Sequence, residues 1–388
     1  MFRASEIYYR LRRTSLFALV VCIVLINACG SSEEPLPVEP NDMMDDEDTT
    51  STTPPANEFD LLLVNQIDSI IIPASENYQV QMTAFLSAVN AFNGSTTQEN
   101  LDAVRDGFSN AYLAYQRIAL HDYFETANTL LVFRSNQFPV DEALLETFIA
   151  NQSFDFTSTN QIRATGFPAL DFMLYGPEDG LGYFTEDENR LSFLVALVNF
   201  LSSEASDLLV DWNDFRDVFI INAGTAQGSS ISTQLNASIL YWEENVREAK
   251  VGFPIGLSGP FDSPGDVNPE LIEAVNRAAF DGNESFTLSL AQASVEELQR
   301  LYTGGNGQGY DDLLATRDQA VDDLIDDQFE LILSELSSRN TILGDTELSG
   351  SPRDAELFDA VQAMVTLFKG DIFALLNVQD EDMMNDGD

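Results

Sequence analysis

The 388-residue chain has one histidine, His121, and two cysteines, Cys22 and Cys29. A zincin needs two histidines one helical turn apart, so this class of metallopeptidase is excluded. A Ser-His-Asp triad would have to use His121. His121 and Glu125 share a helix face, but two ligands do not make a metal site. We therefore interpret His121 as a histidine at the surface or at a helix end, with acidic neighbours.

Basic residues are also scarce. The chain has 18 Lys and Arg against 64 Asp and Glu, which gives a formal net charge of -46. A phosphate backbone needs a basic protein face, so nucleic acid is excluded as a partner. Anionic lipid surfaces are disfavoured as direct partners, whereas cations and cationic peptides remain open. Apolar residues make up 44% of the chain, enough to build cores, so the chain is not wholly disordered.

Residues 1–28 resemble a bacterial lipoprotein signal peptide. An apolar run, residues 16–26, follows four arginines and is too short for a transmembrane helix of about 20 residues. It ends in Ala28-Cys29, which resembles a lipobox, so we expect cleavage before Cys29 and a lipid on its sulfur. The alternative is an ordinary signal peptide or a short anchor. The four arginines are Arg3, Arg10, Arg12 and Arg13.

The remaining chain divides into a tether, a helical body and a tail. Residues 29–58 are rich in Ser, Thr, Pro, Asp and Glu, which predicts a flexible tether. Apolar residues then recur at three- and four-residue steps, the period of an amphipathic helix. A Gly/Ser-rich stretch near residue 222 interrupts the pattern. We predict an all-α body of two four-helix-bundle-like domains, residues 59–222 and 223–379, followed by an acidic tail, 380–388.

Start signals and periodicity place several helices. Capping-box spacing at Thr96 and at Thr185 predicts two helix starts. In the second half we expect helices over residues 231–251, 294–302, 310–338 and 353–378. The glycine-rich run 304–309 is interpreted as an interhelical loop, since it lacks the Lys-Ser/Thr of a P-loop. The long joining segments, 126–165 and 252–283, are candidates for function because long loops often carry it.

In the stretch 165–176, Gly166 precedes a short apolar helix that contains a single acid, Asp171, and Gly176 closes it. Pro168 suits the first turn of this helix. A buried acid is costly unless it is paired. Asp171 is therefore either bonded to an arginine or backbone amides in a structural role, or it belongs to a polar site.

The tripeptide Gly166-Phe167-Pro168 recurs as Gly252-Phe253-Pro254 in the second half. Glycine relaxes the backbone and proline sets the next turn. We predict that the two segments face each other across the domain interface and form a ligand cleft lined by Asp171. Arg190 and Lys250 are its candidate basic partners.

These segments resemble the imelysin-like family of bacterial envelope proteins, whose motif is Gly-x-His-x-x-Glu. Gly166 matches the glycine, Pro168 stands at the histidine position and Asp171 at the glutamate position. Residues 250–257, KVGFPIGL, resemble the family's Lys-x-Gly-x-Pro-x-Gly segment. The resemblance covers roughly residues 60–388 and includes the helical segments 97–125, 310–336 and 369–378.

The resemblance implies two four-helix bundles with the motif near their interface, a periplasmic or outer-membrane location and a link to iron uptake. Pro168 removes the motif's best metal ligand, so a remaining site for iron or another divalent cation would be all-oxygen and built from Asp171 and other acids. We predict a non-enzymatic binding protein that is anchored to the outer membrane, on its periplasmic or surface face, through Cys29. The alternatives are a peptidase, as some members are labelled, and an acidic surface interaction module that has lost its ligand.

Overall fold

The computed structural model describes residues 57–123, 131–152, 154–258, 271–282, 285–339 and 352–381. The predicted signal peptide, Cys29, nearly all of the tether, Glu125 and the tail from residue 382 lie outside these residues. The described residues form helices and loops and contain no strand, which confirms the all-α prediction. The division into two domains at residue 222 stays a prediction.

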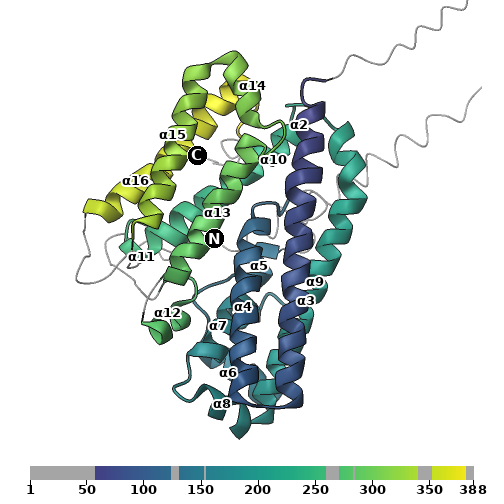
Figure 1. Ribbon diagram of the computed structural model, residues 1–388, viewed down its shortest axis with the longest axis vertical. Helices are drawn as coiled ribbons and strands as arrows, with labels where there is room; N and C mark the ends of the chain where they lie inside the picture. Colours follow the sequence, from purple (N-terminus) through teal and green to yellow (C-terminus); the bar gives the residue numbers. More distant parts are fainter. Residues whose placement is uncertain are drawn as a thin grey trace, which may run out of the picture. The chain divides into compact units, whose positions relative to one another are not determined.

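Three long helices lie side by side in the first half of the body (Figure 1). α3 (Ile72–Gly94) packs along both α4 (Gln98–Ala119) and α9 (Glu188–Ile221), and α2 (Asp60–Asn65) and η1 (Gln66–Ile71) lead into it. By length and composition α9 could cross a membrane, but its apolar residues include many that pack in the core with α3. The apolar side chains at three- and four-residue steps form the buried face.

The first long joining segment contains short helices between α4 and α9. They are α5 (Leu131–Ser135), α6 (Glu142–Asn151), η3 (Ile162–Ala164), α7 (Gly166–Tyr175) and α8 (Gly180–Glu186). α7 is the predicted apolar helix, although it begins at Gly166, which was expected to precede it, and we call it the motif helix. It packs against α4, α5, α6 and α9, so its apolar side chains are buried on several sides.

The second half contains a long bent helix and a further group of helices. α10 (Ser230–Tyr241) continues through η4 (Trp242–Gly252) into α11 (Phe253–Ile255). The others are α12 (Val275–Asp281), α13 (Ser285–Thr303), α14 (Tyr310–Arg317), α15 (Gln319–Ser337), α16 (Pro352–Thr366), η5 (Leu367–Ile372) and α17 (Phe373–Leu376). The glycine run 304–309 lies between α13 and α14, as predicted.

Several predicted helix boundaries are wrong. The predicted helix 310–338 is broken at Asp318, because its side chain accepts hydrogen bonds from Ala320 N and Val321 N and so caps a new helix. α13 begins well before residue 294, at Ser285. The N-caps of α4 and α9 are Thr97 and Asp187, whereas Thr96 and Thr185 were predicted. The side chains of Thr97 and Asp187 accept hydrogen bonds from the free amides of the first turn.

The two halves meet where α4 packs against α13 and α7 packs against α12 (Figure 1). His121 lies at this junction, just after the end of α4, and is fully buried. Its Nε2 lies 3.0 Å from Glu297 Oε1 on α13. The prediction of a helix-end position is therefore confirmed, whereas a surface position is wrong because α13 covers the ring.

Candidate functional site at the motif helix

The motif helix begins against the backbone of α5. Gly166 has a φ of +73°, and a Cβ atom at this position would lie 2.3 Å from the carbonyl oxygen of Ser135. Thr165 Oγ1 donates a hydrogen bond of 3.1 Å to the carbonyl oxygen of Arg134. Arg134 in turn forms an ion pair with Glu204 on α9, with a distance of 2.9 Å. Only glycine combines this backbone conformation with so close an approach.

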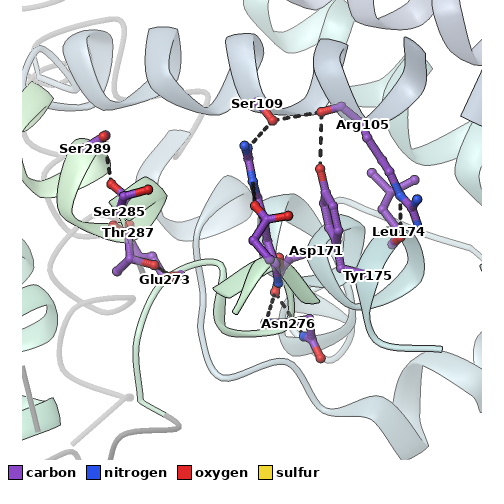
Figure 2. A network of polar contacts seen from close by, with 12 residues as sticks. Arg105, Ser109, Asp171, Leu174, Tyr175, Glu273, Asn276, Ser285, Thr287 and Ser289 are labelled. Carbon is purple, nitrogen blue, oxygen red and sulfur yellow. Dashed lines mark hydrogen bonds and ion pairs between the residues drawn. The ribbon is translucent and has the colours of Figure 1, made fainter. Parts of the chain in front are cut away.

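Asp171 lies one turn into the motif helix and is almost fully buried. Its Oδ2 accepts hydrogen bonds from the backbone N of Asn276 (2.8 Å) and from Asn276 Nδ2 (3.0 Å), and its Oδ1 accepts one from the backbone N of Arg277 (3.1 Å). Figure 2 shows Asp171 and Asn276 joined in this way. Of the two alternatives for this acid, the structure has the pairing with backbone amides.

Burial controls the protonation of this carboxyl group. Removal from water raises the pKa of Asp171 from 3.8 to about 6, because burial penalises the charged form. The N–H donors of Asn276 and Arg277, and the positive charge of Arg277, act in the opposite direction and limit the rise. The ionised form is therefore stabilised at neutral pH by the first turn of α12.

A small hollow adjoins Asp171. Its volume is about 10 Å³, room for roughly one water molecule, and Pro168 and Asp171 line it together with residues 138–140, Ile272 and residues 274–276. Gly252 and Pro254 do not contribute to this lining. The residues of the second half that line this hollow therefore lie within 272–276, and the repeated tripeptide Gly252-Phe253-Pro254 is not among them. Pro254 is buried in α11, while the Gly252 carbonyl accepts hydrogen bonds from Leu257 N and Ser258 N at the helix end.

Lys250 lies in a buried polar cluster in η4. Its Nζ donates to Glu273 Oε2 (2.5 Å) and to Gln116 Oε1 (2.9 Å). Glu273 Oε1 also accepts hydrogen bonds from Asn136 Nδ2 and Gln116 Nε2, and Ser294 Oγ donates to Gln116 Oε1. Burial lowers the pKa of Lys250, and the negative charge of Glu273 opposes that change.

One segment, residues 273–277, connects both predicted groups. Glu273 pairs with Lys250, and Asn276 and Arg277 donate to Asp171. Asp171 and Lys250 therefore contact the same segment, although no hydrogen bond joins them directly. Arg190 has other partners, since its guanidinium lies 4.1 Å from the ring centre of Tyr183 and 3.7 Å from Glu146.

Known proteins show the same fold and family. The family model described as Imelysin (peptidase M75) matches residues 71–369. This chain belongs to the imelysin family. No protein with a curated description matches it.

Two solved structures are similar to this imelysin. An imelysin-like protein from Psychrobacter arcticum 273-4 has a TM-score of 0.65 and 14% identity, over 83% of this chain and 96% of that one. A protein named as an iron-regulated protein A precursor from Parabacteroides distasonis ATCC 8503 has a TM-score of 0.67 and 15% identity, over 84% and 97%. At these identities the likeness shows the fold alone.

The motif of this imelysin does not fit a divalent cation. Pro168 offers no ligand atom, and both carboxylate oxygens of Asp171 accept hydrogen bonds from N–H groups, whose partial positive charge repels a cation. Within the described ranges, no group of three or more His, Cys, Asp and Glu is placed to hold a metal ion. The all-oxygen cation site expected at Asp171 is therefore not formed by these side chains.

The sequence did not single out Gln116, Glu273, Asn276 or Arg277. The last three lie in or beside the long joining segment 252–283, which was flagged only as a region. Gln116 is one of many polar residues on an amphipathic helix. Its burial follows from the packing of α13 on α4, which no local pattern encodes.

Proposed function

We propose that this imelysin is a lipid-anchored, non-enzymatic binding component of the cell envelope, associated with the uptake of iron or another cation. Membership of the family and the likeness to a protein named as iron-regulated support the association with iron. The net charge of -46 supports it too, because an acidic surface raises the local concentration of cations.

The hydrogen bonds between Asp171 and α12 are the observation that supports a non-enzymatic role. A general acid or base must reach a substrate proton, and a ligand must reach a metal ion. The hydrogen bonds of Asp171 instead go to α12, and Pro168 has no side-chain group that ionises or ligates. His121 is buried against Glu297, so it does not replace the missing motif histidine at the surface.

The same observation favours a second candidate, an acidic interaction module that has kept the fold and lost the ligand. Titration of the purified mature protein with Fe(II), Zn(II) and Ca(II) separates the two. A saturable heat of binding supports the binding component, and its absence supports the interaction module. A proteolysis assay with casein, with and without a chelator, tests the peptidase alternative. Chelator-sensitive cleavage that co-purifies with the protein would contradict a non-enzymatic role.

The anchor is tested separately. We propose that Cys29 carries the lipid and holds the protein at the outer membrane, because the preceding residues resemble a lipoprotein signal. Cys29→Ala should move the protein from the membrane fraction to the soluble fraction, with Cys22→Ala as the matched control. A Cys29→Ala protein that remains in the membrane fraction would show that another segment anchors it.

A further inference from the structure

Residues 273–277 contact four other elements, η4, α7, α4 and α13, largely through polar groups. Glu273 pairs with Lys250 of η4, Asn276 and Arg277 donate to Asp171 of α7, and Arg277 Nη1 donates to Ser109 of α4. The two apolar side chains, Ala274 and Val275, pack in the core, and the Arg277 guanidinium lies 3.7 Å from the ring centre of Phe286 on α13. Thr287 Oγ1 of the same helix donates to the carbonyl oxygen of Glu273. A hydrogen bond exchanged for one to water changes the free energy little, provided that water reaches both freed groups when the segment moves.

The backbone of the segment is strained at Ala274. Its φ is +54° and its ψ is 39°, the left-handed region that a residue with a Cβ atom seldom adopts. The residue is nearly fully buried and lies between the two groups of clamping contacts, Glu273 on one side and Asn276 on the other. Such strain persists only where surrounding contacts impose it. The Lys250 and Asp171 contacts are the strongest available to impose it, since both are charge-assisted.

The segment also occupies the motif carboxylate. Its N–H groups donate hydrogen bonds to both carboxylate oxygens of Asp171, and residues 274–276 line the hollow beside Pro168. Figure 2 shows Asn276 of this segment beside Asp171, and Glu273 beside Thr287. Glu273 likewise neutralises Lys250. When the segment moves away, one buried anion and one buried cation lose their partners together.

We propose that residues 273–277 form a strap, which serves as an internal partner of Asp171 and Lys250 and swings away about Ala274 to expose the buried Asp171 carboxylate. The strap is a property of this chain's own contacts and does not depend on the cation named in the proposed function.

Hydrogen exchange of the intact mature protein tests the strap. In the wild type, the amides of residues 275–277 should exchange faster than those of α4 and α13, which open only with the body. Ala274→Gly removes the strain and should slow their exchange about threefold. Ala278→Gly is the matched control in α12, and it should speed exchange because it places glycine in helical backbone.

Lys250→Met tests independently whether the Lys250–Glu273 ion pair holds the strap in place. It should speed exchange of residues 275–277 by tenfold or more while α3 and α9 keep their protection. Ala274→Gly leaves every clamping side chain in place, so it remains informative if Lys250→Met does not fold. The proposal is overturned if Ala274→Gly leaves exchange of residues 275–277 unchanged or faster, or if these amides exchange only together with α4 and α13.

Discussion

Lys250 Nζ lies 2.5 Å from Glu273 Oε2, and the two side chains are 3% and 1% exposed. This buried ion pair joins η4, in which the family-like segment 250–257 begins, to the strap that caps Asp171. Taking two charges out of water costs more than their attraction returns unless further hydrogen bonds satisfy them. Gln116 and Asn136 supply those bonds, so the pair is embedded in a nearly complete polar network.

Removing one charge of the Lys250–Glu273 pair should destabilise the protein more than removing both charges. Lys250→Met leaves the Glu273 charge buried without its cation and should lower the free energy of unfolding by about 3–5 kcal/mol. The double variant Lys250→Met with Glu273→Gln removes both charges and should recover part of that loss. Urea unfolding of the three variants and the wild type measures the coupling. Additive losses would show that the two charges do not depend on each other.

Gly166 should not tolerate a side chain. Gly166→Ala places a Cβ atom 2.3 Å from the Ser135 carbonyl oxygen, at a φ of +73°, so we expect a loss of at least about 2 kcal/mol in the free energy of unfolding. Gly370→Ala is the matched control, because Gly370 lies in helical backbone and nothing lies within 4 Å of its added Cβ. That change should be neutral or stabilising. Equal effects at both sites would refute the close contact with α5.

Asp122 should make stability depend on pH. Burial raises the pKa of Asp122 from 3.8 to about 7, although the amides of Val132 and Leu131 oppose the rise. The folded state thus holds a proton that the unfolded state releases between pH 4 and 7. The contribution is fully present below pH 4 and is lost as pH rises towards 7, by at most about 1.4 kcal/mol per pH unit.

Asp122→Asn removes this titrating group. Its free energy of unfolding should fall less than that of the wild type between pH 4 and 7, as measured by urea unfolding at each pH. Asp214→Asn, an exposed acid on α9, is the control and should leave the profile unchanged. Parallel profiles for wild type and Asp122→Asn would contradict the raised pKa.

The sequence predicted what depends on local pattern. The helical period located α3, α4 and α9, and the Gly-x-Pro-x-x-Asp stretch predicted the motif helix, because apolar spacing and turn residues are local signals. The break after Ile221 was visible for the same reason. The Asp318 break was missed because an acid inside an acidic amphipathic run gives no distinct capping signal.

The partners within the site depend on tertiary packing and could not be predicted. Tripeptide similarity suggested residues 252–256 as the other side of the hollow, yet residues 272–276 lie there. Proximity in sequence suggested Arg190 for Asp171, yet Arg190 stacks on Tyr183. Lys250 was predicted as the other basic partner of Asp171, yet it pairs with Glu273, because the packing of the strap against η4 places Glu273 beside it.

The central claim is that Asp171 in this imelysin is a structural clamp on the strap and not a metal ligand. The most direct test is calorimetric titration of Fe(II) and Zn(II) into the wild type and Asp171→Asn, with urea unfolding of both. We predict the same binding isotherm for the two proteins, whether or not it shows binding, and a loss of about 1–3 kcal/mol in the free energy of unfolding of Asp171→Asn. A folded Asp171→Asn protein that loses a metal-binding step shown by the wild type would contradict the account.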